Sequence, residues 1–402
     1  MKLNLHAEAT RLGGIFDMLA LQPEDALLGL IGRFRADRRL GKIDLGVGVY
    51  KTETGSTPVM RAVKAAEDLL LAQQESKSYL GAEGDQIFTD RLATIAFGSE
   101  MAACDRLTGV QAPGGTGALR LGAELLKAAR PHASVWMGTP TWPNHAPIFT
   151  AAGLSVRKHR FYDVARGKVD FEAMYTDLAD ASAGDIILLH GCCHNPTGAP
   201  LTSAEWRTLT ELCEERGLVP FIDLAYQGLG DGLEADAAAT RHLLAGLPSA
   251  LVAYSCDKNF GLYRDRVGAL WVQAATVPQA QIVRGNILAR ARAMWSMPPD
   301  HGAAIVRLIL QHGELHALWS AELDGMRFRI NAMRELIAAY HPRLHGVGQQ
   351  RGMFAMLPLA AHQVTALRDE HAIYMPTNGR INIAGLTVEN IPRLAAALTP
   401  YL

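Results

Sequence analysis

The chain has 402 residues, of which 49 % are hydrophobic, so it is long enough for a large core and more than one domain. Its 39 lysine and arginine residues balance 40 aspartate and glutamate residues, which predicts neither a nucleic-acid partner nor an anionic membrane surface. No apolar stretch approaches the roughly 18 residues of a membrane span. Residues 1–15 lack the apolar core of a secretory signal, and we expect them to be an extension outside the fold.

The cysteines indicate a reducing compartment. They are odd in number and too sparse for a disulfide framework, so we expect a cytoplasmic protein. His190, Cys192, Cys193 and His194 suggest a zinc site. However, neighbouring side chains of an extended segment point to opposite faces and no second Cys/His pair follows at metal spacing, so we predict no metal. The five cysteines are Cys104, Cys192, Cys193, Cys213 and Cys256.

The N-terminal region combines helical patterns with glycine-rich turns. Pro23–Phe34 and Pro58–Gln74 have the apolar spacing of helices. Between them, Gly46, Gly48 and Gly55 indicate a backbone that turns tightly or approaches another group closely. Lys77–Gly81 then reads as a loop that carries the hydroxyl of Tyr79.

Short apolar runs alternate with longer helical patterns through the middle of the chain. This alternation predicts an α/β fold with a mainly parallel, doubly wound sheet and helices on both faces. The predicted strands are Gly109–Ala112, Ser134–Gly138, Ser155–His159, Asp185–His190, Leu218–Asp223, Ala250–Tyr254 and Gly268–Val272, and the helices between them include Ala118–Ala129, Ser203–Arg216 and Ala237–Ala245.

A second, smaller domain is expected after the sheet. Apolar residues recur at 319, 323, 326, 330, 333 and 337, which predicts one long helix over Trp319–Tyr340. Met353–Leu357 and Arg380–Ala384 read as short strands. We therefore predict a large domain over residues 57–320 and a small domain from residues 16–56 and 321–402.

Ligands of such sheets gather at the carboxyl ends of the strands, and several chemically useful groups stand there. The glycine-rich turn Pro113–Gly117 opens a helix and could hold a phosphate. Trp142, between two prolines, offers a flat surface. Asp223 ends an apolar strand, where a carboxylate is costly unless a cation or donor meets it.

Lys258 follows another buried strand, about 35 positions after Asp223. A lysine at the rim of a core can lose solvation, which lowers its pKa and makes its amine a nucleophile toward carbonyls. Pyridoxal phosphate needs a lysine for its aldehyde, an anion for its ring nitrogen, a stacking face and a phosphate site. These features together therefore predict that cofactor.

Seven motifs in order resemble the class I aminotransferases, and within them the aspartate and aromatic amino acid subgroup of fold type I. The resemblance runs from about Pro23 to the C-terminus. It implies a large domain with a mainly parallel seven-stranded sheet and a smaller α/β domain. The motifs are GVGVYK, PGGTGALR, TWPNHAPIF, HNPTG, DLAYQG, KNFGLY and GRINIAGL.

The resemblance implies a role for individual cofactor-binding residues. Lys258 would form the aldimine with pyridoxal phosphate and move the proton, while Asp223 would pair with the ring nitrogen with His145 behind it. The catalytic residues would be Lys258, Asp223 and Tyr226. The remaining cofactor contacts would be Gly115, Thr116, Trp142, Asn195, Tyr226, Ser255, Arg266 and, from the other subunit, Tyr79.

The resemblance also implies how substrates bind. Arg380 would grip the substrate α-carboxylate as a bidentate fork. Arg292 of the partner subunit would meet a second carboxylate. Gly48, Trp142 and Asn195 would complete the substrate contacts. The implied protein is a homodimer with composite sites, and its partners would be amino acids and 2-oxo acids.

The chain departs from the subgroup where Asp257 replaces a small hydroxyl residue directly before the lysine. Met294, Trp295 and Met297 also stand near Arg292, where aspartate-specific members are more polar. We therefore predict ping-pong transamination of aromatic amino acids, aspartate and glutamate, with 2-oxoglutarate as acceptor. The alternatives are a narrow aspartate aminotransferase, a lyase or synthase acting at Cβ or Cγ, and a non-catalytic regulator that binds the cofactor.

Overall fold

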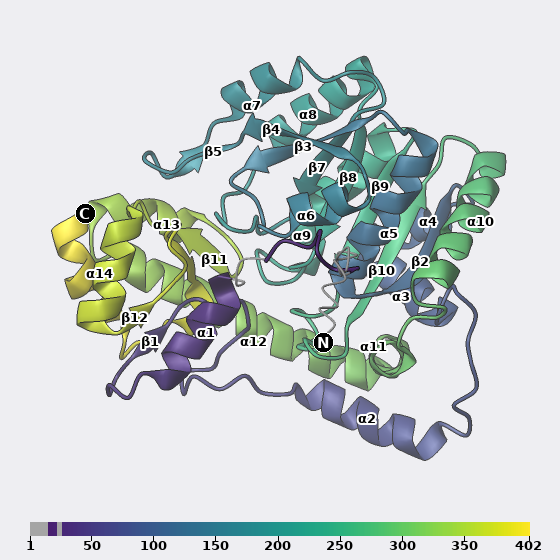
Figure 1. Ribbon diagram of the computed structural model, residues 1–402. Helices are drawn as coiled ribbons and strands as arrows, with labels where there is room; N and C mark the ends of the chain where they lie inside the picture. Colours follow the sequence, from purple (N-terminus) through teal and green to yellow (C-terminus); the bar gives the residue numbers. More distant parts are fainter. Residues whose placement is uncertain (1–14, 22–25) are drawn as a thin grey trace, which may run out of the picture.

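The computed structural model describes residues 15–21 and 26–402 and is an α/β protein (Figure 1). Its centre is a seven-stranded sheet with the order β2-β10-β9-β8-β7-β3-β4. Only β10 runs antiparallel to its two neighbours, β2 and β9. The strands are β2 (Leu107–Pro113), β3 (Ser134–Thr139), β4 (Ser155–Arg160), β7 (Ile186–His190), β8 (Val219–Leu224), β9 (Ala250–Ser255) and β10 (Val267–Gln273).

Both faces of the sheet are buried, because successive side chains of each central strand enter different cores. In β8, Phe221 belongs to one hydrophobic cluster and Ile222 to the other. In β9, Leu251 and Val252 alternate in the same way. One face is covered by α5 (Gly114–Ala129), α6 (His145–Ala151) and α10 (Val277–Met294), and the other by α3 (Gln86–Phe97), α8 (Ser203–Arg216), α9 (Leu233–Gly246) and α11 (Asp300–Gln311).

A smaller α/β unit lies beside the sheet, on the left in Figure 1. It contains a parallel pair, β1 (Ile43–Asp44) with β12 (Ile373–Tyr374), and an antiparallel pair, β11 (Phe354–Met356) with β13 (Arg380–Asn382). The long helix α12 (Gly313–Ala338) runs from beneath the sheet toward this unit. Its other helices are α1 (Ala26–Ala36), α13 (His345–Gln349), α14 (Ala361–His371) and α15 (Ile391–Leu398).

Short elements complete the chain. The helix α2 (Arg61–Gln73) crosses below the sheet in Figure 1 and packs on α11 and α12. The remaining elements are α4 (Ser99–Ala102), β5 (Tyr162–Asp163), β6 (Lys168–Val169), α7 (Phe171–Leu178) and three 3-10 turns at Pro342–Leu344, Ile383–Gly385 and Thr399–Tyr401.

The fold class expected from the sequence is confirmed, and all seven predicted strands are the strands of the large sheet. Differences occur at the ends of elements. The last predicted strand stops at Asn382 and continues as a 3-10 turn, and α9 begins at Leu233, four positions before the predicted start. Part of the predicted Pro23–Phe34 helix lies outside the described residues. Among the described residues, no helix is both long and apolar enough to cross a membrane.

Candidate active site

Lys258 stands in the loop that follows β9, with its amine among charged and aromatic groups. Its Nζ atom lies 3.8 Å from Asp257 Oδ2 and 5.4 Å from the centre of the Tyr226 ring. Burial lowers the pKa of the Lys258 amine, while the charges of Asp257 and Asp223 oppose that shift. The amine is therefore easier to deprotonate than that of an exposed lysine, as the sequence predicts.

Asp223 lies near the end of β8, where it pairs in register with His190 of β7 and Ala253 of β9. Its Oδ2 atom lies 3.0 Å from His145 Nε2, and His145 Nδ1 lies 2.8 Å from Thr141 Oγ1. Burial alone would raise the pKa of Asp223, but the hydrogen bond from His145 and the neighbouring positive charge outweigh it and lower the pKa. Asp223 is thus a buried group that stays an anion.

Asn195 and Tyr226 come from the loops that follow β7 and β8, and their side chains meet. Asn195 Nδ2 donates to the Tyr226 hydroxyl at 3.3 Å. Burial raises the pKa of this phenol, so Tyr226 remains protonated and can donate to an anionic oxygen. Asn195 Oδ1 is buried and has no hydrogen-bond partner among the described residues.

The first turn of α5 and Arg266 form a cup suited to an anion. Gly114 has a φ of 69°, and a Cβ atom added there would lie 2.5 Å from Arg266 Nη2. A Cβ atom on Gly115 would lie 3.0 Å from the Cβ atom of Ser255. Glycine is therefore needed for the N-terminus of α5 to approach these groups. The free N–H groups at this helix N-terminus favour a bound anion.

Arg380 lies on β13 and is held close to the glycine-rich N-terminal segment. Its Nη2 atom donates to the carbonyl of Gly46 at 2.7 Å, and its guanidinium lies 4.6 Å from the centre of the Phe354 ring. A Cβ atom on Gly48 would lie 2.8 Å from the same ring, which explains why that position needs glycine. Arg380 Nε is buried without a hydrogen-bond partner among the described residues.

The other predicted site residues are less enclosed. Trp142 is partly buried and makes an edge contact with His145, with 5.2 Å between ring centroids. Tyr79 is 91 % exposed in the loop between α2 and α3. Arg292 is exposed near the end of α10 and hydrogen-bonds to Ser296. The single chain therefore brings Tyr79 and Arg292 into no contact with Lys258.

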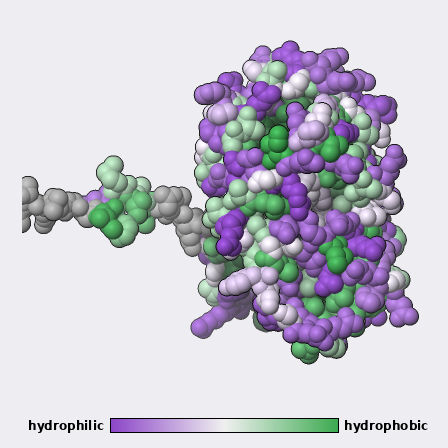
Figure 2. All heavy atoms as spheres, turned by 90° about the vertical axis from the view of Figure 1, so that its right-hand side faces the viewer, coloured by the Kyte–Doolittle hydropathy of each residue, from purple (hydrophilic) through white to green (hydrophobic). Residues whose placement is uncertain are grey.

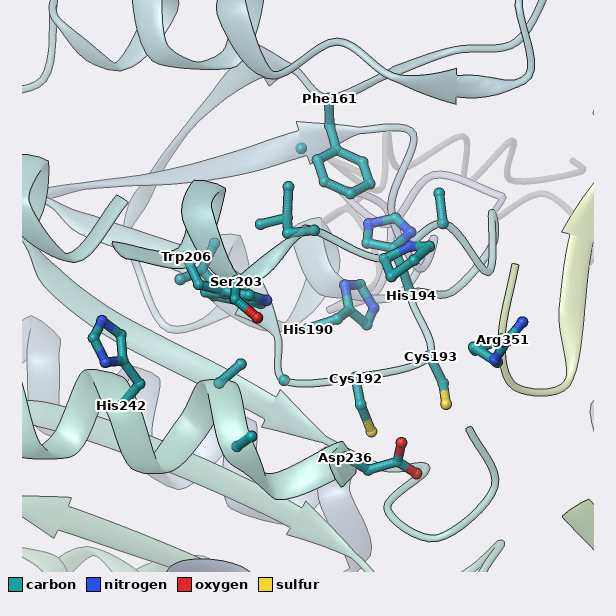
Figure 3. Close-up of a pocket in the computed structure, with 18 of the residues that line it drawn as sticks. Phe161, His190, Cys192, Cys193, His194, Ser203, Trp206, Asp236, His242 and Arg351 are labelled. Carbon is teal, nitrogen blue, oxygen red and sulfur yellow. The ribbon is translucent and has the colours of Figure 1, made fainter. Parts of the chain in front are cut away.

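A separate cavity of about 490 Å³ lies next to this site and does not include Lys258. Figure 3 shows His190 and His194 pointing into it, with Trp206 of α8 and His242 of α9 on the opposite wall. His190 connects the two regions, since its ring lies 5.2 Å from that of His145 and 4.2 Å from that of His194. Burial lowers the pKa of His190 to about 3, so the His190 ring is uncharged at neutral pH.

The two adjacent cysteines face the same way, contrary to the alternation assumed from the sequence. Cys193 has a φ of 49°, which breaks the extended geometry. As a result both thiols lie within 4.8 Å of Asp236 (Figure 3). The Asp236 carboxylate already accepts backbone N–H groups of Gly228, Gly230 and Asp231 at 2.8–2.9 Å. Its acceptor sites are thus used by the loop, and the absence of a metal site stays our prediction.

Three supporting residues were not predicted from the sequence. Thr141 fixes His145, Phe354 lies against Arg380, and Arg334 of α12 donates to the carbonyls of Gly352 and Phe354 at 2.6 Å each. Arg334 is fully buried, which lowers its pKa to about 9. A polar residue in the buried stripe of a helix is the one signal that could have identified Arg334.

The sheet and the groups at its carboxyl edge define an enzyme of fold type I. The family described as "Aminotransferase class I and II" matches residues 41–398. The chain is 50 % identical to a tyrosine aminotransferase of Rhizobium meliloti, over 96 % of this chain and all of the relative. It is 42 % identical to an aspartate aminotransferase of Escherichia coli, over 96 % of this chain and all of that protein.

A solved structure leads to the same family. The aromatic-amino-acid aminotransferase from Burkholderia pseudomallei, described as covalently bound to pyridoxal phosphate, superposes with a TM-score of 0.94. The two chains are 38 % identical, and the match covers 97 % of this chain and all of the other. The protein therefore belongs to the class I and II aminotransferases.

Proposed function

We propose that the protein is a pyridoxal-phosphate-dependent aminotransferase that accepts both aromatic and dicarboxylic amino acids, with 2-oxoglutarate as amino acceptor. The observation that carries the proposal is the surroundings of Lys258. Burial lowers the pKa of its amine, and the charges of Asp257, Asp223 and Arg266 also act on it. An amine, an anion and a phosphate site are three of the four groups that this cofactor requires, and Trp142 offers the fourth, a stacking face.

The described residues fit the cofactor. Arg266, Ser255 and the first turn of α5 would hold its phosphate, and the glycines at 114 and 115 leave the room for it. Asp223 would face the protonated ring nitrogen, while Asn195 and Tyr226 would face the ring oxygen. When bound, the protonated ring acts as an electron sink for the bond that breaks at the substrate Cα atom. Lys258 would take and return the proton of that carbon.

Arg380 is the proposed receptor for the substrate α-carboxylate. Its contact with Gly46 and its position against Phe354 fix the guanidinium plane, so the remaining N–H groups can form a two-pronged pair. Burial lowers the pKa of Arg380, yet a guanidinium stays charged at neutral pH. A fixed, desolvated cation binds a carboxylate more strongly than an exposed one.

Arg292 and its neighbours are the proposed determinants of side-chain choice. A guanidinium can pair with a distal carboxylate, and it can also move to water or stack when an aromatic ring enters. Met294 and Met297 offer adaptable apolar surface on the same segment. The names of the two relatives, one a tyrosine and one an aspartate aminotransferase, favour both substrate classes.

A substrate panel tests this proposal. The purified protein would be assayed with 2-oxoglutarate and with aspartate, glutamate, tyrosine, phenylalanine or tryptophan as donor. We expect turnover with both classes. Background rates on tyrosine and phenylalanine would leave a narrow aspartate aminotransferase. Release of a Cβ or Cγ group in the absence of the acceptor 2-oxoglutarate would indicate a lyase or synthase, and cofactor binding without any turnover would indicate a regulator.

We also propose a homodimer in which each active site uses residues of both subunits. Large apolar side chains are exposed on α2, α10 and the 15–21 segment, an arrangement typical of a surface that another chain covers. Figure 2 shows apolar patches on the face that includes α10. The exposed residues include Leu71, Ile282 and Met294, together with Ile15, Phe16, Met18, Leu19 and Leu21, and Tyr79 is exposed in the loop after α2.

Mixed dimers test the shared site. One subunit would carry Lys258→Ala and the other Arg292→Leu, and aspartate would be the donor. If Arg292 acts on the partner's site, one site collects both lesions and the other keeps both residues, so about half of the wild-type activity returns. If Arg292 acts on its own site, both sites are damaged and no activity returns.

The remaining proposals concern organisation and compartment. We propose that residues 57–320 form the cofactor-binding domain and that residues 16–56 and 321–402 form the small domain, with α12 as the connection. Free thiols at all five cysteines are in keeping with the proposed reducing cytoplasm. Limited proteolysis with mass spectrometry would test the domain boundaries.

A further inference from the structure

Asp257 is an acidic residue buried beside the anion cup, where it pairs with Arg266. Its side chain is 7 % exposed, and its Oδ2 atom accepts a hydrogen bond from Arg266 Nη1. The same oxygen lies 3.8 Å from Lys258 Nζ. Its backbone N–H donates to Ser255 Oγ at 3.3 Å, which holds the residue beside the cup. The other oxygen, Oδ1, is buried without a hydrogen-bond partner among the described residues.

Arg266 is shared between this carboxylate and the cup. Its Nη1 atom donates hydrogen bonds to Asp257 and to the carbonyl of Tyr263. Its Nη2 atom lies against Gly114 at the start of α5. One edge of the guanidinium is thus neutralised by the chain itself. The other edge faces the helix N-terminus, where a phosphate would bind.

A phosphate monoester carries a charge of about −1.5 to −2 at neutral pH. Arg266 and Lys258 are the cations that lie next to Asp257 in the described structure. Asp257 offsets one of these positive charges before any phosphate arrives. A neutral residue at this position would leave the cup one unit more positive.

We propose that Asp257 competes with the phosphate of the cofactor for Arg266 and so limits how tightly the protein retains its cofactor. This inference rests on the proposed function. The effect is greatest for the amine form of the cofactor, because only the aldehyde form can bond covalently to Lys258. After an amino acid has given up its amine, the phosphate contacts carry most of the binding. Asp257 therefore makes the amine form the exchangeable one.

The opposite role for Asp257 is to orient Arg266 for the phosphate. The two roles predict opposite signs. If the carboxylate competes, neutral replacements bind the cofactor phosphate more tightly; if it orients, they bind more weakly. Asparagine keeps the shape of aspartate and can still accept from Arg266, so Asp257→Asn removes the charge with little change in contact.

The test measures binding to the cofactor-free dimer by equilibrium dialysis, with pyridoxamine phosphate and inorganic phosphate as probes. We expect Asp257→Asn and Asp257→Ser to bind both probes at least tenfold more tightly than the wild type, a change of about 1.4 kcal/mol. The matched control is Asp265→Asn, in the same loop. Asp265 has its side chain against Gly302 of α11, so its replacement should change binding less than threefold.

Unchanged or weaker binding of both probes by a folded Asp257 variant would overturn the proposal. Circular dichroism would establish folding, and if one variant fails to fold, the other decides. An equal gain in Asp265→Asn would also overturn it, since the effect would then come from net charge alone. Failure of the wild type to bind pyridoxamine phosphate or pyridoxal phosphate would instead contradict the proposed function.

Discussion

Two groups of residues make up the proposed site, and they differ in how the single chain holds them. Lys258, Asp223 and Arg380 are largely enclosed, and each lies near a group from another segment of the same chain, namely the Tyr226 ring, His145 and the carbonyl of Gly46. Tyr79 and Arg292 are exposed and form no bond to any of these three residues. The enclosed group contains the proposed chemistry, and the exposed group contains the proposed contacts of the partner subunit.

This difference indicates which properties depend on one chain and which depend on the dimer. Buried charges need fixed partners, because an unpaired charge in a core costs several kcal/mol (about 3–5 when a partner is removed). Exposed residues do not require fixed partners, so their side chains can change conformation when a different substrate binds. We therefore expect substitutions in the enclosed group to affect all substrates alike, and in the exposed group we expect Arg292 to act selectively on substrates and Tyr79 to act on cofactor binding.

The largest effect should come from Lys258→Ala. We expect loss of the yellow colour of the bound cofactor and a fall in turnover of at least about 10⁴-fold on every donor, because the variant lacks both the amine for the aldehyde and the proton carrier. Absorbance and steady-state rates measure the two losses. Lys127→Ala, near the C-terminal end of α5, is the control and should behave as wild type. Full transamination by Lys258→Ala without added amine would refute the site.

Asp223→Asn should cost on the order of 10³-fold in kcat/KM for aromatic and dicarboxylic donors alike, since it removes the charge that is proposed to face the ring nitrogen of the cofactor. The lowered pKa of Asp223 keeps the carboxylate ionised at neutral pH, and the stability it contributes is lost only as the pH falls through that lowered pKa. The free energy of unfolding of Asp223→Asn should therefore fall less steeply with decreasing pH than that of the wild type.

Asp185 is a carboxylate at the opposite end of the sheet strands from Asp223, and its replacement distinguishes an effect on stability from an effect on catalysis. Asp185 precedes β7 and accepts from Ser134 N at 2.8 Å and Trp136 Nε1 at 2.9 Å. Asp185→Asn should lower the melting temperature but leave turnover per folded molecule within about threefold of wild type. A larger loss of turnover in Asp185→Asn than in Asp223→Asn would contradict the assigned roles.

The sequence predicts the enclosed group better than it predicts the residues that hold this group in place. Short apolar runs and period-3.6 apolar patterns predict the strands and helices, and polar residues at strand ends point to Asp223 and Lys258 as members of the proposed site. Phe354 and Thr141 leave no such signal, because an aromatic residue in a strand or a threonine before a helix has many ordinary roles. Their importance comes only from the tertiary contacts with Arg380 and His145.

The sequence also misleads where local backbone geometry is unusual. The alternation rule separates Cys192 from Cys193, yet the positive φ of Cys193 turns both thiols to one side. Asp257 could equally have repelled a phosphate or paired with a cation. In the structure Asp257 pairs with Arg266, nine positions later in the chain. The spacing of the two residues in the sequence could not specify this pair.

Arg292→Leu should divide the substrates. We expect about a 100-fold loss in kcat/KM for aspartate and glutamate, because a charge-assisted pair is removed, and a change within about tenfold for phenylalanine. The control is Arg290→Leu, two positions earlier on α10, where the guanidinium binds Asn286 and the carbonyl of Glu124. Equal losses on both substrate classes would assign Arg292 to the fold or the dimer.

The smallest effect should come from Tyr79→Phe. The proposed role of this hydroxyl is one hydrogen bond from the partner subunit to the cofactor phosphate, and a bond to a charged acceptor is worth about 1.5–3 kcal/mol. Solvent access at the subunit boundary favours the lower figure, so the dissociation constant of pyridoxamine phosphate should rise by about tenfold. Turnover at saturating cofactor should stay near wild type for both substrate classes, because the ring of Phe keeps the packing. If the variant binds the cofactor as wild type does but loses dimer stability in sedimentation, Tyr79 belongs to the subunit interface and the cup is built by one chain alone.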